Sequence, residues 1–97
     1  MIKTILPGKT IGIIGGGQLG RMLAMSAKEM GYKIAILDPS DMCCAKIFSD
    51  VFIKANFDDF EKVEELCKHS DVITFEFENI DADALSKLEK KYNFVQS

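Results

Sequence analysis

The stretch that decides the fold is Gly15-Gly16-Gly17-Gln18-Leu19-Gly20-Arg21, which directly follows Thr10-Ile11-Gly12-Ile13-Ile14. The earlier segment is a short apolar run that ends at consecutive glycines, as is typical of a buried strand in a parallel sheet. The later segment has the spacing G-x-G-x-x-G and leads into a region of helical periodicity. A strand, a glycine turn and a helix in this order predict a loop whose backbone N–H groups hold a phosphate.

The same kind of pattern extends through the rest of the chain. Apolar spacing at Leu19, Leu23, Ala27 and Met30 predicts a first helix, with Gly31 as its C-terminal cap. Further apolar runs predict strands at 33–37, 51–55, 71–75 and 93–96. Amphipathic patterns predict helices at 58–68 and from Asp81 onward.

Two of these segments carry finer expectations. The helix at 58–68 is expected to turn Phe60, Val63, Leu66 and Cys67 toward the core. Segment 42–49 is ambiguous, and a short helix there would turn Ala45 and Phe48 inward.

Strands and helices that alternate in this way predict a parallel sheet with helices on both faces. The fold class is therefore α/β, a Rossmann-like doubly wound sheet of about five strands in the order 3-2-1-4-5. Residues 1–97 are expected to form one domain, because the chain shows no linker or internal repeat.

Composition narrows the function further. The net charge is −3 and the lysines are scattered, which argues against a nucleic-acid binder. No apolar segment approaches the roughly 18 residues that a membrane span needs. Cys43, Cys44 and Cys67 lack the spacing of a disulfide framework or a metal site, and His69 is the only histidine. We therefore expect reduced thiols and a cytoplasmic protein.

Two charged residues near the glycine loop leave alternatives open. Asp38 ends the second predicted strand, where an acidic side chain could bind the ribose of NAD or simply cap the turn Asp38-Pro39-Ser40. Arg21 lies in the first turn of the predicted helix, where a cation opposes the helix dipole. It therefore either contacts a ligand or points into solvent.

A second cluster of polar residues is Thr74-Phe75-Glu76-Phe77-Glu78-Asn79, at the end of the fourth predicted strand. In a sheet of order 3-2-1-4-5 this strand neighbours the first, and ligands bind outside the carboxyl ends of the two. Glu76 is thus expected to face the glycine loop, whereas Glu78 fits a solvated loop better. A phosphate cradle opposite a carboxylate suggests a phosphorylated ligand that carries a hydroxyl or an amine at its other end.

Three stretches, 15–22, 37–39 and 71–79, together resemble the N-terminal domain of 5-(carboxyamino)imidazole ribonucleotide synthase. That enzyme is the ATPase subunit of phosphoribosylaminoimidazole carboxylase, and the resemblance covers essentially the whole chain. It implies the pre-ATP-grasp domain of an ATP-grasp ligase of purine biosynthesis. In this family ATP activates bicarbonate as carboxyphosphate, and the amine of 5-aminoimidazole ribonucleotide captures the carboxyl group, with release of ADP and phosphate.

The resemblance also implies roles for individual residues. Backbone groups of Gly17, Gln18 and Leu19 would contact the ribose phosphate, and Glu76 would contact the ribose or the amine side of the ribonucleotide. Further candidates for substrate contact are Gly16, Arg21, Asp38 and Glu78.

The chain departs from the family in two ways. The ATP-grasp domains, with the Mg²⁺ carboxylates and the nucleotide-binding lysines, would follow Ser97, so ATP and Mg²⁺ are expected to bind outside this chain. No catalytic residue and no metal ligand are expected within it. In addition, Met42-Cys43-Cys44-Ala45 stands where the family tends to have a small-residue segment with proline.

The implied partners are 5-aminoimidazole ribonucleotide, the ATP-grasp domains of the same enzyme, and a second subunit in a homodimer. Two other functions remain open from the residues themselves. One is a small NAD-binding module, and the other is a non-catalytic domain that packs against a partner chain.

Overall fold

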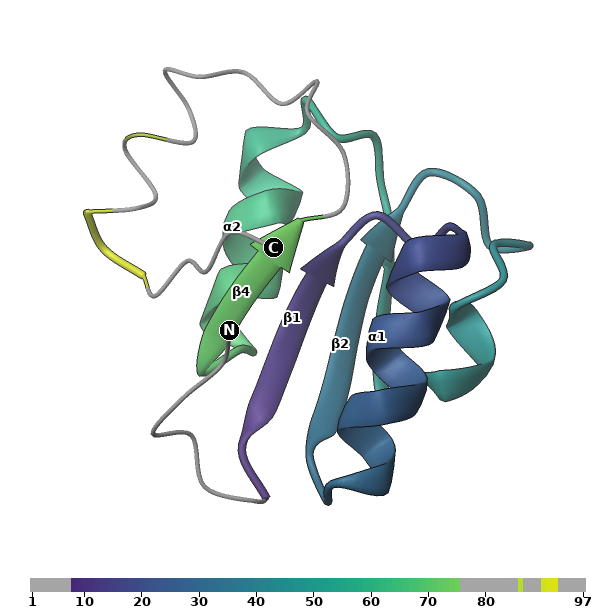
Figure 1. Cartoon of the computed structure of the whole chain (residues 1–97). Coiled ribbons are helices and arrows are strands. Elements are labelled where there is room, and N and C mark those ends of the chain that lie inside the picture. Colours follow the sequence, from purple (N-terminus) through teal and green to yellow (C-terminus); the bar gives the residue numbers. More distant parts are fainter. Residues whose placement is uncertain (1–7, 76–85, 87–89, 93–97) are drawn as a thin grey trace.

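A parallel sheet forms the centre of the molecule, with β1 in its interior (Figure 1). The computed structural model of the chain describes residues 8–75, 86 and 90–92. The sheet order is β3-β2-β1-β4, and all three pairings are parallel. This confirms the predicted order for the described strands, while the expected fifth strand at 93–96 lies outside the described residues. The strands are β1 (Thr10–Ile14), β2 (Lys33–Asp38), β3 (Val51–Lys54) and β4 (Val72–Phe75).

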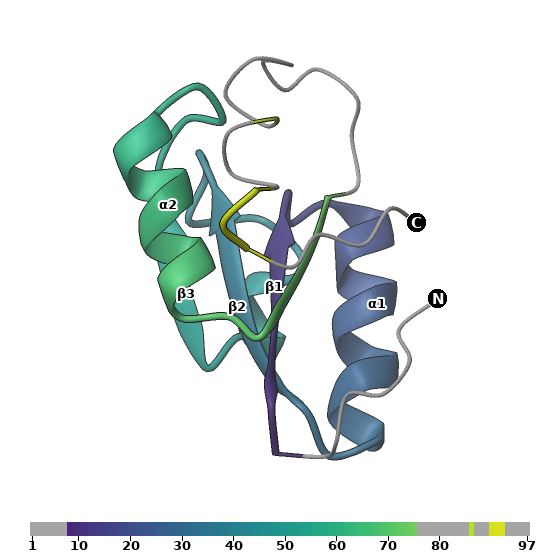
Figure 2. The same ribbon diagram turned by 90° about the vertical axis from the view of Figure 1, so that its left-hand side faces the viewer.

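Two helices cover opposite faces of this sheet (Figures 1 and 2). α1 (Gln18–Glu29) connects β1 to β2, and α2 (Phe60–Lys68) connects β3 to β4. A single 3₁₀ turn, η1 (Lys46–Phe48), precedes β3. The arrangement is the doubly wound α/β fold that the alternating pattern predicts, and the helix expected from Asp81 lies outside the described segments.

Side chains alternate along the strands to build one apolar cluster on each face. In β1, Ile11 and Ile13 belong to the cluster under α1, whereas Ile14 belongs to the cluster under α2. In β2, Ile34 and Ile36 likewise alternate with Ala35 and Leu37. The central strands are therefore buried on both sides, which explains why they are continuous apolar runs rather than polar–apolar alternations.

The packing of α1 differs from the simplest interpretation of its apolar spacing. The buried residues of the helix are Gly20, Ala24 and Ala27, so small side chains bring the helix close to the sheet. Two of the large apolar residues in the pattern are exposed instead, Leu19 by 47% and Met30 by 63%. Periodicity thus located the helix correctly, and Ala27 and the half-buried Leu23 face the core as the spacing indicates, whereas Leu19 and Met30 do not.

The end of α1 is the cap that Gly31 predicts. Gly31 has a φ of 93°, and its N–H donates to the carbonyl of Lys28. The N–H of Tyr32 donates to the carbonyl of Ala27, which completes a Schellman motif.

α2 follows its prediction except at its first residue. Val63, Leu66 and Cys67 are buried, but Phe60 is exposed by 39%, so the expected burial of Phe60 is wrong. Phe60 begins the helix, directly after the capping residue Asp59, at the edge of the sheet where β3 has already ended.

Segment 42–49 is mostly irregular and ends in η1. Ala45 is fully buried, and Phe48 packs partly buried against the cluster under α1. Both inward orientations that the sequence suggests are therefore confirmed.

The described residues near the C-terminus contact α2. The hydroxyl of Tyr92 donates to Glu64 Oε2 at 3.1 Å, and Lys91 Nζ donates to the same oxygen at 2.9 Å. The Tyr92 ring packs against the cluster under α2. These contacts fasten a segment 28 residues away in sequence to the helix.

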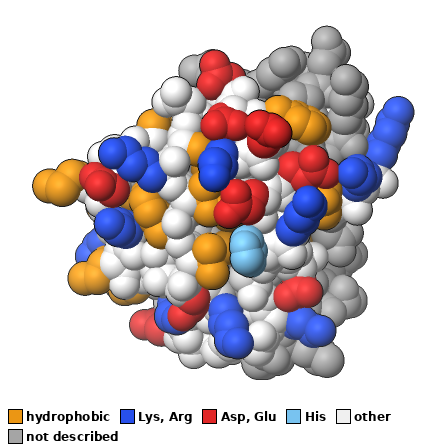
Figure 3. Space-filling model, turned by 180° about the vertical axis from the view of Figure 1, so that it is seen from behind, with side chains coloured by type: hydrophobic (Ala, Val, Ile, Leu, Met, Phe, Trp, Pro, Cys, Tyr) orange, Lys and Arg blue, Asp and Glu red, His pale blue; other side chains and the backbone are white. Residues whose placement is uncertain are grey.

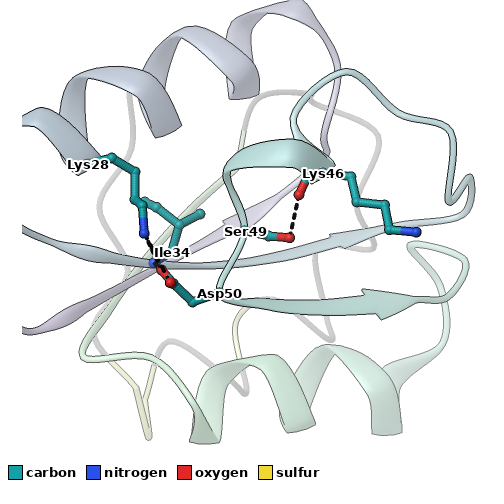
Figure 4. A network of polar contacts seen from close by, with 5 residues as sticks. All are labelled: Lys28, Ile34, Lys46, Ser49 and Asp50. Carbon is teal, nitrogen blue, oxygen red and sulfur yellow. Dashed lines mark hydrogen bonds and ion pairs between the residues drawn. The ribbon is translucent and has the colours of Figure 1, made fainter.

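Two aspartates close the amino edge of the sheet in the same way. Asp50 accepts a hydrogen bond from Ile34 N at 2.8 Å, and its own N–H donates to the carbonyl of Ile34 at 2.7 Å. Asp71 forms the equivalent pair of bonds with Thr10, both of 2.8 Å. Each aspartate precedes a strand and pairs with the neighbouring strand, so its carboxylate extends the ladder by one bond. Lys28 of α1 adds an ion pair of 2.9 Å to Asp50 (Figure 4).

We predict that the Asp50 contacts make stability depend on acid pH. Burial opposes ionisation of this carboxyl, but hydrogen bonds from Ile34 N–H and Lys28 outweigh it and lower the pKa of Asp50 below its ordinary value of 3.8. A lowered folded-state pKa stabilises the protein above the unfolded-state pKa, and this contribution is lost as the pH falls through the folded-state value. Replacement of Asp50 by Ala should therefore lower the free energy of unfolding by about 1–2 kcal/mol at pH 7.

Urea denaturation between pH 7 and pH 2.5 measures this effect. The difference between wild type and Asp50→Ala should shrink below about pH 4. Lys28→Met is the matched control, because it removes a half-exposed ion pair and keeps the Ile34 bond, and it should cost at most about 0.5 kcal/mol. A difference between wild type and Asp50→Ala that stays constant with pH would contradict the prediction.

Candidate functional site

The candidate site lies at the carboxyl edge of the sheet, where the glycine loop joins β1 to α1. The register pairs Ile14, the last residue of β1, with Phe75, the last residue of β4. β1 and β4 therefore end at the same edge of the sheet. Glu76 and Glu78 lie outside the described residues, so their predicted place opposite the loop stays a prediction.

The first two glycines of the loop are fastened to β2. Gly15 has a φ of 108°, a conformation that favours glycine, and its N–H donates to the carbonyl of Leu37 at 2.8 Å. The N–H of Gly16 donates to Asp38 Oδ2 at 2.7 Å, and the carbonyl of Gly16 accepts from Ala45 N at 3.0 Å. Both polar groups of the Gly16 backbone are thus engaged, the N–H by the last residue of β2 and the carbonyl by the segment after β2.

Asp38 uses both of its carboxylate oxygens on backbone groups. Oδ2 accepts from Gly16 N, and Oδ1 accepts from Ser40 N at 2.9 Å. The second bond is the turn-capping role that the sequence offers for this residue. The first bond reaches back 22 residues to the glycine loop, a contact that the local sequence did not indicate.

The side of Gly16 that faces away from the helix is filled by Cys43. A Cβ atom added to Gly16 would lie 2.5 Å from Cys43 Sγ and 3.3 Å from Ile36 Cγ2, so only glycine fits there. Burial, with the nearby carboxylate of Asp38, raises the pKa of the Cys43 thiol. Cys43 therefore remains a protonated packing group at neutral pH, not a nucleophile.

The start of α1 has features of an anion site. Gly17 is the N-cap, and no side chain caps this helix end in the described structure. The first turn contains no acidic residue, so the positive end of the helix dipole is not offset there. α2 is different, because Asp59 caps it and Glu61 lies in its first turn. An anionic ligand at α1 would take the place that carboxylates hold at α2.

The predicted phosphate-binding residues are placed for this role. Gln18 and Leu19 open α1, where an α-helix supplies no intrahelical acceptor for their N–H groups. Both residues are exposed, whereas Gly17 is half-buried. The structure thus brings Gly17, Gln18 and Leu19 together at one accessible helix end beside the loop.

Arg21 has a contact that neither sequence alternative included. Its guanidinium carbon lies 5.7 Å from the centre of the Phe48 ring, within cation–π distance. The residue is half-buried. Arg21 therefore links α1 to η1 within the protein, and a ligand contact would have to coexist with this packing.

Away from the loop, the surface over α2 is charged, whereas the surface beside α1 has an apolar groove. On the face that carries α2, acidic and basic side chains are interspersed (Figure 3). On the side of α1, an apolar groove of about 220 Å³ is lined by side chains of β1 and α1 and by the residue before β2. Its lining residues are Ile11, Leu23, Ser26, Ala27, Met30 and Tyr32.

The described part of the chain lacks two kinds of feature. Among the described residues, no three or more His, Cys, Asp or Glu side chains gather as a metal site would require. Within the same residues, neither helix has the length and apolar character needed to cross a membrane.

Comparison with known proteins agrees with this architecture. Residues 8–96 match the model of the ribonucleotide synthetase preATP-grasp domain. N5-carboxyaminoimidazole ribonucleotide synthase of Staphylococcus epidermidis RP62A is 52% identical over 89 residues, which are 92% of this chain and 24% of that protein. The same enzyme of Staphylococcus aureus MRSA252 is 53% identical over the same length.

Solved structures give the same relationship. N5-carboxyaminoimidazole synthetase of S. aureus with ADP superposes with a TM-score of 0.92 at 49% identity, covering 96% of this chain and 25% of that one. The enzyme of Aspergillus clavatus, in complex with ADP and 5-aminoimidazole ribonucleotide, has a TM-score of 0.83 at 35% identity, covering 93% and 24%. This chain spans about a quarter of the length of these relatives. It belongs to the ribonucleotide synthetase preATP-grasp domain family.

Proposed function

We propose that this chain is the substrate-binding N-terminal domain of a ligase that carboxylates 5-aminoimidazole ribonucleotide with bicarbonate and ATP in purine biosynthesis. The observation that carries the proposal is the start of α1, where no side chain of the described residues caps the helix and no acidic residue offsets the positive dipole end, which favours a phosphate. The relatives support it, since the A. clavatus enzyme is described with this ribonucleotide bound.

Each residue of the candidate site has a stated task in this proposal. The N–H groups of Gly17, Gln18 and Leu19 bind the phosphate of the ribonucleotide. Glu76 directly follows Phe75, the register partner of Ile14, and is proposed to accept hydrogen bonds from the ribose or the amine. Glu78 remains a weaker candidate for the same edge.

The chemistry itself is proposed to take place with the remaining three-quarters of the enzyme. ATP and Mg²⁺ would bind there, and ATP would activate bicarbonate for capture by the amine of the ribonucleotide. The present domain then contributes binding and orientation of the nucleophilic substrate, which is an effective way to lower a barrier between two reactants. A cytoplasmic location fits this pathway and is part of the proposal.

The alternative of an NAD-binding module loses its main support. In dinucleotide-binding folds the acidic residue after the second strand binds the ribose hydroxyls. Here both carboxylate oxygens of Asp38 accept backbone N–H groups, one from Gly16 and one from Ser40. An NAD ribose would have to share these oxygens with the two backbone N–H groups.

We predict that a proline at position 18 weakens ribonucleotide binding without unfolding the helix. Gln18 is the first helical residue, a position that tolerates proline, and Gly17 has the extended conformation that a following proline requires. Gln18→Pro removes one proposed phosphate donor, so the dissociation constant for 5-aminoimidazole ribonucleotide should rise about tenfold or more by calorimetry.

Gln18→Ala is the matched control, since it keeps the N–H and removes only the side chain, and its affinity should stay within about twofold of wild type. NADH should not bind either variant or the wild type at comparable concentrations. If the wild type bound NADH but not the ribonucleotide, the proposal would be refuted.

A chimera tests the activity. Residues 1–97 would replace the equivalent quarter of the S. aureus enzyme, and ADP release would be measured with and without ribonucleotide and bicarbonate. We expect ADP release that depends on both substrates, and a loss of at least tenfold in kcat/KM in Glu76→Gln, because a substrate-binding carboxylate is removed. An active chimera in which Glu76→Gln changes nothing would refute the role of Glu76.

The proposal also includes two packing partners, the ATP-grasp domains of the same polypeptide and a second subunit. The exposed residues Leu19, Met22 and Met30 form a stripe along α1, and Met30 also lines the apolar groove. An apolar stripe of this kind is typical of a surface that another domain covers.

We predict that this stripe binds a hydrophobic dye in the isolated chain. The double variant Met22→Lys with Met30→Lys should lower the fluorescence of bound 8-anilinonaphthalene-1-sulfonate at least twofold, because it places two charges on the stripe. Met42→Lys is the control, since Met42 is 87% exposed and lies outside α1. Equal dye binding by wild type and the double variant would contradict a packing role for the stripe.

A further inference from the structure

The strongest unassigned feature is the carboxylate of Asp38, which bridges the glycine loop and the turn after β2. We propose that Asp38 is a positioning residue that orients the loop for phosphate binding, and that it does not itself contact the substrate. This inference rests on the proposed function, because it takes the glycine loop and the start of α1 as the phosphate cradle.

Asp38 orients the peptide between Gly15 and Gly16. Its N–H donates to Asp38 Oδ2 at 2.7 Å. A peptide unit is planar and trans, so a fixed N–H direction also fixes the opposite direction of its carbonyl. Asp38 therefore sets the orientation of the whole peptide unit that enters the loop.

The next peptide, between Gly16 and Gly17, is oriented by Ala45. Its carbonyl accepts from Ala45 N at 3.0 Å, on the side of the segment that follows Asp38. Because the N–H of a trans peptide points opposite to its carbonyl, Gly17 N–H is directed away from that segment. Asp38 and Ala45 thus orient two consecutive peptide units. The direction in which α1 begins is thereby fixed.

Only a carboxylate can accept both of the hydrogen bonds that Asp38 receives, because each bond ends on a different oxygen. Oδ2 accepts from Gly16 N and Oδ1 accepts from Ser40 N. Asparagine has one acceptor oxygen, and its NH₂ group would face the other N–H donor. Asp38→Asn therefore keeps the size of the side chain and loses one of the two bonds.

The negative charge of Asp38 and its positioning role predict opposite changes in the phosphate affinity of Asp38→Asn. A carboxylate near a phosphate repels it, so removal of the negative charge alone should strengthen phosphate binding. If Asp38 orients the loop, its replacement should instead weaken binding. Asp41→Asn is the matched control, because it removes the same charge three residues later. Asp41 is exposed and forms an ion pair of 3.9 Å with Lys54, the last residue of β3.

The experiment titrates ¹⁵N-labelled wild type, Asp38→Asn and Asp41→Asn with inorganic phosphate and with 5-aminoimidazole ribonucleotide, followed by amide shifts. We expect Asp38→Asn to weaken both ligands about tenfold, to raise the hydrogen-exchange rate of the Gly16 amide at least tenfold, and to leave the shifts of β1 and β4 native. Asp41→Asn should bind both ligands as wild type does or slightly more tightly.

The other outcomes distinguish a failure of the positioning role from a failure of the proposed function. Unchanged or tighter phosphate binding by a folded Asp38→Asn would overturn the positioning role. A loss confined to the ribonucleotide, with inorganic phosphate unaffected, would also overturn it, because it would mean direct contact with the ribose. Asp38→Ser is the second variant, and it should show the same loss if the asparagine variant does not fold. Wild type that binds phosphate at Gly17–Leu19 but not the ribonucleotide would refute the proposed function alone, and binding of neither ligand would refute both.

Discussion

The structure depends on the double pairing of β1. This strand forms parallel ladders with β2 on one edge and with β4 on the other, and Ile11, Ile13 and Ile14 are buried almost completely. A strand in this position has no edge and no face left for solvent, which is why its sequence is a short apolar run. Gly12 meets the remaining constraint, because a Cβ atom there would overlap the side chain of Ser70 in the turn before β4. The same strand thus determines how closely α2 and its following turn approach the sheet.

The geometry of the glycine loop follows from this pairing. β1 and β2 are parallel, and the last residue of β1, Ile14, is in register with Leu37, so β2 extends one residue further, to Asp38. The carbonyl of Leu37 and the carboxylate of Asp38 consequently lie within reach of the first two loop amides. A loop fixed in this way costs little further entropy when a ligand binds, which favours affinity for a small anion.

The local pattern of the chain predicted a large part of this architecture, and the errors have physical causes. β1 has the predicted bounds, and the strand order is the predicted one for all described strands. Apolar spacing predicted only part of the buried face of α1, since close helix–sheet packing buries Gly20 and Ala24 beside Ala27 and leaves Leu19 exposed. The bond from Asp38 to Gly16 spans 22 residues, and no local pattern reports a contact that exists only once two strands are parallel and aligned. The one available signal was an acidic residue at the end of the strand next to the loop, and it supported two roles equally.

The same signal shows why the spacing G-x-G-x-x-G is weak grounds for naming a ligand. The motif requires a tight turn, a close backbone approach and a helix start, and a monophosphate and a dinucleotide can both use these features. One feature that bears on the choice between them is the direction of the acidic side chain at the end of β2. When it points outward it offers acceptors to ribose hydroxyls, and when it points back into the loop, as Asp38 does, it gives its acceptors to Gly16 and Ser40. The specificity of such a fold is therefore decided by hydrogen bonds beneath the loop as much as by the loop itself.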